Sequence, residues 1–352
     1  MAAISTLLIA VPFFAEAQSK KEIVASYYDL INTQQTQFAH TRDSAHLEVI
    51  YKAVLTWDSI LVSNAFTEIL EDAVTFYNRK NDFPRTLHYL QQLVTCGKSI
   101  QMLNYLKEEK EEYTSFFNSK YGAELFDSFE EKRNVYKQNL VLAYYALNNY
   151  ITAVDQFART FLDGGGEAYF GANDYEGFSY LTPELKKKIE KTTIALADSL
   201  CFEDIITSYN EYGFPSSSKS GKGGLGFIYA HLFINCAPIY SSTGVSSVIF
   251  IDSIMKEAVW EGEVSASEYA FWKDNSTNPH SRACKNIFST YATPHNIGGG
   301  IKKISGDILD IKNLDKRRQE IMLPPLYVTA VTDKFDLPSN YVMPKNCPPI
   351  KK

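Results

Sequence analysis

The chain has 352 residues, 45% hydrophobic and 22% charged, a composition typical of a folded globular protein. This length exceeds what one ordinary hydrophobic core organises, so we expect two domains. The formal net charge of −6 argues against sequence-independent binding of nucleic acid, which needs a basic surface.

The first residues predict export. Residues 4–14 form an apolar run, far shorter than the roughly 20 residues of a membrane span. Ala15-Glu16-Ala17 fits the small-x-small cleavage rule, so we predict a signal peptide at 1–17, a mature start at Gln18 and a periplasmic or extracellular location. No Lys or Arg precedes the run, and a buried first helix is the alternative. We expect no transmembrane segment after the signal peptide.

The five cysteines are scattered and contain no Cys-x-x-Cys pair. In an exported protein their odd number leaves at least one thiol outside any disulfide. We expect buried thiols that pack as small apolar side chains, and the pairing stays open. The cysteines are Cys96, Cys201, Cys236, Cys284 and Cys347.

From about residue 20 to 200 the apolar residues recur at spacings of three and four, which predicts a mainly α-helical fold. Such a stripe is typical of a helix that packs against a core. One stripe is Leu47, Ile50, Tyr51, Val54 and Leu61, a second is Leu140, Ala143, Tyr144 and Leu147, and a third is Leu185, Ile189, Thr192, Leu196 and Leu200.

Residues 76–87 and 143–154 share a pattern. In both, a helix with an aromatic residue near its end runs into Asn plus Asn or Asp, and an aromatic residue starts the next helix. This resembles the tetratricopeptide repeat, a helix–turn–helix unit of about 34 residues. We therefore predict a tetratricopeptide-like domain at 18–162, with an irregular helical bundle as the alternative. The resemblance implies a protein or peptide partner.

Glycine-rich sequence then interrupts the helical pattern and predicts a linker at 163–181. Thr182 and Pro183 suit the N-cap and first position of a new helix, which begins a C-terminal helical domain at 182–335. Within it we expect a helix at 203–212 ended by Gly213, a turn at 216–222 and helices at 225–235, 245–261, 265–274 and 315–322. We also expect a short β-hairpin within 291–310 and a Pro-rich tail at 336–352.

A set of landmarks in residues 200–330 resembles a bacterial family known as a domain of unknown function. The landmarks are Gly213-Phe214-Pro215, Ala230-His231, Gly262-Glu263-Val264, Tyr269-Ala270 with Asp274, Tyr291-Ala292-Thr293, Arg317-Arg318 and Leu323-Pro324-Pro325-Leu326. Ala230, Asn275 and Pro294 replace the Gln, Arg and Gln of the family pattern. The resemblance implies a fold boundary and no established reaction.

His231 is the leading candidate for a catalytic residue, since it lies mid-helix among apolar residues. A buried His beside a carboxylate can act as a general base, and Glu257, Glu263 and Asp274 are the candidate partners. Arg317 or Arg318 could bind an anion bidentately. The alternative, which we favour, is a buried polar network that holds the C-terminal helices together.

Two further motifs are weak. Residues 221–226 contain Gly-x-Gly-x-x-Gly, but a dinucleotide site needs a preceding strand that the sequence does not predict. His280, Cys284 and His295 could bind zinc, yet a fourth ligand is not evident. We predict no cofactor and no metal.

Two functional hypotheses remain. The first is an exported, non-enzymatic helical scaffold that binds a protein or peptide, and it predicts an open concave surface lined by Tyr and Phe. The alternative is an enzyme or small-ligand binder with a polar cleft around His231, in which an acidic residue and an arginine converge on that ring.

Overall fold

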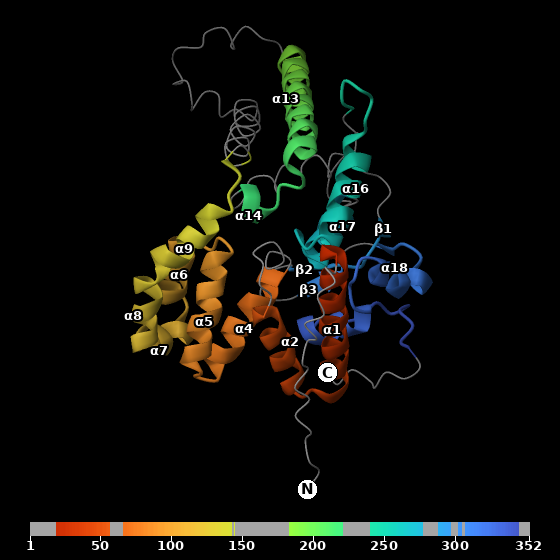
Figure 1. Ribbon diagram of the computed structural model, residues 1–352. Coiled ribbons are helices and arrows are strands. Elements are labelled where there is room, and N and C mark those ends of the chain that lie inside the picture. The colour runs from red at the N-terminus through yellow and green to blue at the C-terminus, as the bar shows by residue number, and fades with distance from the viewer. Residues whose placement is uncertain are drawn as a thin grey trace.

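A computed structural model of the chain describes residues 19–56, 66–142, 144, 183–220, 240–276, 288–296, 302–304 and 307–344. In these ranges the protein is mainly α-helical, as the sequence predicts (Figure 1). The predicted signal peptide at 1–17 and linker at 163–181 lie outside the described residues. No helix of the described part is both long enough and apolar enough to cross a membrane.

The N-terminal helices form an array of short, packed elements. They are α1 (Lys20–Thr41), α2 (Ala45–Leu55), α4 (Thr67–Arg79), α5 (Phe83–Thr95), α6 (Ile100–Glu109), η2 (Glu111–Tyr113), α7 (Thr114–Phe117), α8 (Lys120–Asp127) and α9 (Phe129–Gln138). α5 lies at the centre of this array, because it packs against α4, α8 and α9.

The C-terminal elements are longer helices followed by short strands and two more helices. They are α13 (Pro183–Tyr212), α14 (Ser217–Ser220), α16 (Ser247–Trp260), α17 (Ala266–Ser276), β1 (Phe288–Ser289), β2 (Pro294–Asn296), β3 (Lys302–Ile304), β4 (Asp307–Ile308), η4 (Ile311–Asn313), α18 (Leu314–Glu320) and α19 (Leu326–Asp333).

Helix α1 joins the two halves of the chain. Ser19 and Glu22 form a capping box that starts the helix. Further along, the Tyr28 hydroxyl accepts a hydrogen bond from Ala266 N at 3.0 Å, and Asn32 Nδ2 donates to Met322 O at 2.9 Å. α1 packs against α2 and also against α16 and α19. One hydrophobic core therefore contains residues from both ends of the described chain.

The turn between α4 and α5 lies where the sequence pattern at 76–87 places it. Asp82 caps α5 by accepting a hydrogen bond from Arg85 N, and Pro84 lies in the first turn. The rings of Tyr77 and Tyr89 stack at 5.3 Å in the core between the helices. Of the second segment, 143–154, only residue 144 is described, so the tetratricopeptide resemblance stays a prediction.

Helix α13 departs from expectation in two ways. It is one continuous helix to Tyr212, where we expected two, and it ends at Gly213 as predicted. Leu196 and Leu200, the stripe residues whose side chains are described, are 59% and 50% exposed. At these two positions the expectation that the stripe packs into the core is therefore wrong. The buried face lies on the opposite side of the helix, where Phe202 contacts Phe250 of α16 at 5.9 Å between ring centroids.

Four short strands follow α17. β2 and β3 pair antiparallel, with Pro294 opposite Ile304, inside the range where we expected a hairpin. β1 and β4 form a parallel pair that the sequence does not predict. The predicted turn at 216–222 contains the short helix α14. Helix α19 was also missed, because Pro325 looks like a helix terminator but is the residue before the first turn of α19.

Gly97 lies where α9 packs closely against the end of α5. Its φ of +97° favours glycine, and a methyl group there would lie 2.7 Å from Cε2 of Tyr136 in α9. We expect Gly97→Ala to lower the free energy of unfolding by about 2–4 kcal/mol, from backbone strain plus overpacking. Urea denaturation measures it. Gly244→Ala is the control: its φ is +80° and its surroundings are open, so it should cost only about 1 kcal/mol. Equal losses would contradict the packing argument.

Candidate functional site

His231 lies outside the described residues, so the structure bears on its proposed partners and not on the ring itself. Of those partners, Asp274, Arg317 and Arg318 converge on one loop, residues 289–293. Glu263 and Glu257 lie elsewhere, in a cluster of lysines and glutamates. The candidates therefore form two sites.

Asp274, near the end of α17, holds the loop through both carboxylate oxygens. Oδ1 accepts hydrogen bonds from Thr290 N at 2.7 Å and Tyr291 N at 2.9 Å. Oδ2 accepts from Ser289 Oγ, Thr293 N and Thr293 Oγ1, each at 2.8 Å. The side chain is buried. These hydrogen bonds hold the loop firmly, because hydrogen bonds to an ionised acceptor are stronger than those between neutral groups.

The two arginines of α18 hold the same loop from its carbonyl side. Arg317 donates Nε to Thr290 O at 3.1 Å, and its two terminal nitrogens donate to Asp310 O and Leu309 O. Arg318 donates Nη1 to Tyr291 O at 2.6 Å. The loop is thus bound through its N–H groups by Asp274 and through its carbonyl groups by the arginines.

Arg318 also links the loop to the Leu-Pro-Pro-Leu segment. Nε donates to Pro324 O at 2.8 Å and Nη2 to Thr329 Oγ1 at 2.6 Å. Burial lowers the pKa of the Arg318 guanidinium to about 10, against the opposing effect of the carboxylates of Asp315 and Asp274. The side chain stays charged at neutral pH, and its charge is met by neutral oxygens of the fold.

Asp315 fixes the start of α19. Its Oδ1 accepts from Leu326 N at 2.9 Å and its Oδ2 accepts from the Tyr341 hydroxyl at 2.7 Å. Four of the sequence landmarks, namely Asp274, Tyr291-Ala292-Thr293, Arg317-Arg318 and Leu323-Pro324-Pro325-Leu326, therefore meet in one hydrogen-bond network. This geometry favours the buried polar network over a catalytic cleft at these residues, because their polar atoms are already bonded to the chain.

Ala292 shows how tightly the loop is held. It is fully buried, its φ is +55°, and its N–H donates to Ser289 Oγ at 2.8 Å. A left-handed alanine costs about 1–2 kcal/mol, so the surrounding contacts must hold it there.

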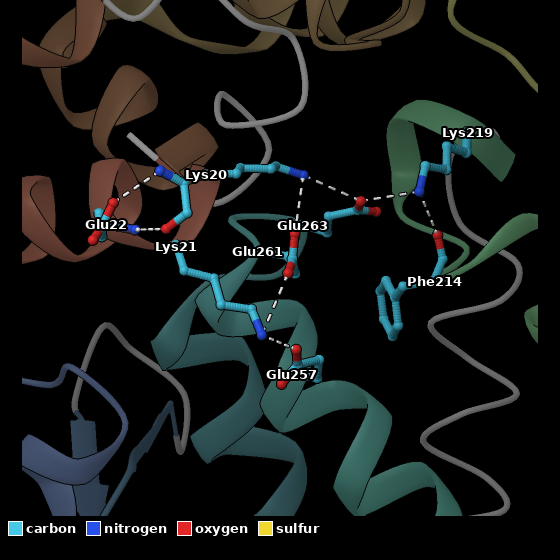
Figure 2. Close-up of polar contacts among 9 residues, drawn as sticks. Lys20, Lys21, Glu22, Phe214, Lys219, Glu257, Glu261 and Glu263 are labelled. Atoms are coloured by element: carbon cyan, nitrogen blue, oxygen red, sulfur yellow. Dashed lines mark hydrogen bonds and ion pairs between the residues drawn. The ribbon is translucent and has the colours of Figure 1, made fainter. Parts of the chain in front are cut away.

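Glu263 lies in the second site, where Lys20, Lys21 and Lys219 meet Glu257, Glu261 and Glu263 (Figure 2). Its Oε1 receives Lys219 Nζ of α14 at 2.9 Å and Lys20 Nζ of α1 at 3.4 Å. Lys219 Nζ also donates to Phe214 O at 3.2 Å. Glu263 exposes 9% of its side chain, and its Oε2 is buried without a hydrogen-bond partner among the described residues. The carboxylate is thus the contact shared by α1 and α14.

The outer part of this cluster is solvent-exposed. Lys21 Nζ contacts a carboxylate oxygen of Glu257 and lies 3.6 Å from one of Glu261, whose second oxygen is 3.9 Å from Lys20. The lysines occupy the first turn of α1, and the glutamates lie at the last turn of α16. A lysine is unfavourable at the positive N-terminal end of a helix, and a glutamate is unfavourable at the negative C-terminal end. Here the lysines of α1 and the glutamates of α16 lie together, so their charges offset each other. The cluster therefore favours placing these two helix ends together.

Sequence reasoning missed Lys20, Lys219 and the loop residues Ser289 and Thr290. Each acts through a partner at least 15 positions away in the chain, so no local spacing identifies it. Among the described residues no group of three or more His, Cys, Asp or Glu side chains could hold a metal ion. Cys96 and Cys201 are buried thiols, and the other cysteines and His280 lie outside those residues.

Comparison of the chain with protein-family models, with curated proteins and with solved structures finds no match. The geometry of these two sites is therefore the basis for a functional proposal.

Asp274→Asn tests the loop network. The amide nitrogen would replace one acceptor oxygen and face N–H or O–H donors, so we expect a loss of about 2–4 kcal/mol in unfolding free energy. Chemical denaturation measures it. Asp310→Asn is the matched control, since that exposed carboxylate makes one side-chain bond, to Asn313 Nδ2. A loss no larger than the control's would show that the network is not needed for stability.

Glu263→Gln tests the lysine–glutamate cluster. Neutralising the shared carboxylate removes the negative charge that Lys20 and Lys219 contact. We expect the free energy of unfolding to fall by about 1–3 kcal/mol. Glu257→Gln, at the exposed edge of the cluster, should change the thermal midpoint much less, because exposed ion pairs contribute little. Thermal unfolding in low and high salt compares the two variants. Equal changes in the thermal midpoint of the two variants would show that burial of Glu263 does not strengthen its ion pairs.

Proposed function

We propose that the chain is a non-enzymatic helical scaffold that acts outside the cytoplasm and binds a protein or peptide partner. One line of support comes from the residues first considered for chemistry. Asp274, Arg317 and Arg318 direct their polar atoms to backbone and side-chain groups of the fold. The enzyme alternative around His231 gains no support from these three partners.

The observation that carries the proposal is the outward face of α13. Leu196 and Leu200 lie one helical turn apart, and both expose at least half of their surface. Figure 1 shows α13 extending away from the other described helices, with its last turns nearest to them. Neighbouring apolar side chains on a projecting helix are typical of a surface that another protein covers.

We therefore propose a partner surface on α13 and not on the aromatic residues of the N-terminal half. We expected Tyr and Phe to line an open concave surface there. Many of these rings are instead core residues, among them Tyr51, Tyr77, Tyr89 and Phe116. They stabilise the array by packing between its helices and are not available to a partner.

Site-specific photo-crosslinking tests the proposal. A photoreactive phenylalanine analogue replaces Leu196 in the full chain, and adducts are identified by mass spectrometry in the cells that make the protein. We expect a protein adduct at 196 that Leu200→Glu reduces several-fold, because a buried charge disfavours an apolar interface. The same analogue at Val342, which is 76% exposed, is the control. Absence of any adduct specific to position 196 would contradict the proposed function.

A further inference from the structure

The start of α1 depends on the residues that directly follow the predicted cleavage site. Ser19 is the N-cap: its hydroxyl accepts a hydrogen bond from Glu22 N at 3.4 Å, and its N–H donates to Glu22 Oε2 at 2.8 Å. Lys20 and Lys21 come next and contact the glutamates of the second site (Figure 2). The contacts that start α1 and hold it to the C-terminal half therefore begin at the first residue after Gln18.

We propose that Gln18, once it is the first residue of the exported chain, closes onto its own side chain and forms a neutral pyroglutamyl end. The inference rests on the proposed function, because the cleavage after Ala17 that exposes this residue belongs to export. It goes beyond that function by naming a covalent modification and its position. Both reacting groups belong to one residue, so no other molecule takes part.

The reaction is an intramolecular acyl transfer. The α-nitrogen of Gln18 attacks the carbonyl carbon Cδ of its side-chain amide, so that an N–Cδ bond forms and the Cδ–Nε2 bond breaks. The proton lost by the amine leaves with Nε2, and the leaving group is ammonia. An α-amino group is partly unprotonated at neutral pH, unlike the amine of lysine. Two groups that react within one small ring also have a very high effective concentration.

The capping box of α1 is compatible with the closed ring. Closure leaves the backbone carbonyl of Gln18 bonded to Ser19, so Ser19 keeps the N–H that it donates to Glu22. Ser19, Lys21 and Glu22 are exposed, so this end of the helix is open to solvent. The modification therefore requires no change in the contacts that begin α1.

Closure also removes a positive charge from the positive end of a helix dipole. Lys20 and Lys21 already lie in the first turn of α1, where cations are unfavourable, and Glu22 is the acidic residue of that turn. A free α-ammonium group on Gln18 would add a third positive charge beside the N-cap. The pyroglutamyl end is neutral and does not add this charge.

The expected consequence is protection of the N-cap and of the lysines that follow it. Aminopeptidases need a free α-amine, and proteolysis concentrates at chain termini. Trimming from a free Gln18 would remove Ser19 next, and then Lys20 and Lys21. The helix would lose first its cap and then its ion pairs with the second site. A closed ring stops this sequence at its first step.

Intact-mass spectrometry of the mature protein, isolated from the cells that make it, tests the inference. We expect the mass of residues 18–352 less one ammonia. The N-terminus should also resist amine labelling and aminopeptidase digestion until a pyroglutamyl peptidase removes the first residue.

Gln18→Asn is the matched control. Its side chain is one methylene shorter, so the corresponding ring would be strained and the α-amine should stay free. We expect this variant to keep its full mass, to accept the amine label and to be shortened by the aminopeptidase under conditions that leave the wild-type chain intact.

The outcomes separate the inference from the proposed function. A mature chain that starts at Gln18 with its full mass and a free amine would overturn the inference and leave the proposed function standing. A mature start at any other residue would overturn it as well. If the chain keeps residues 1–17 and stays in the cytoplasm, the inference fails together with the proposed location. If Gln18→Asn is not exported, the mass of the wild-type chain still decides.

Discussion

The carboxylate of Asp274 is the contact on which the C-terminal part of the molecule depends. It gathers the N–H groups of residues 290, 291 and 293, while Arg317 and Arg318 take the carbonyl groups of the same loop. β1 precedes this loop and β2 follows it, and the arginines carry the connection onward to Leu309, Asp310 and Pro324. Removing the carboxylate would leave several donors of this loop unsatisfied at once, which is why the network behaves as a unit.

A second set of charges joins segments that lie far apart in the sequence. Lys20 and Lys219 share one oxygen of Glu263, which ties the start of α1 and the short helix α14 to the segment after α16. Around this shared carboxylate, lysines at the positive end of α1 meet glutamates at the negative end of α16. Helix α1 is thereby held at its first turn by charge and along its length by apolar packing and by Tyr28 and Asn32.

These two networks and the outward face of α13 lead to the same proposal. Asp274, Arg317 and Arg318 are bonded within the fold, where they hold the loop in position. On α13, Leu196 and Leu200 each expose at least half of their surface. The scaffold that we propose would use its polar groups for internal rigidity and a helix face for association.

The sequence by itself determined the helical class, the turn between α4 and α5, the end of α13 at Gly213 and the region of the antiparallel strands. These follow from local signals: spacing of apolar residues, Asp82 as a cap, and glycine where φ is positive. It also identified Asp274, Glu263, Arg317 and Arg318 as notable polar residues. Only the tertiary structure decided what they contact, and that the Leu196 and Leu200 stripe faces outward. Spacing defines which side chains share a face, but burial and hydrogen-bond partners come from segments that are distant in the chain.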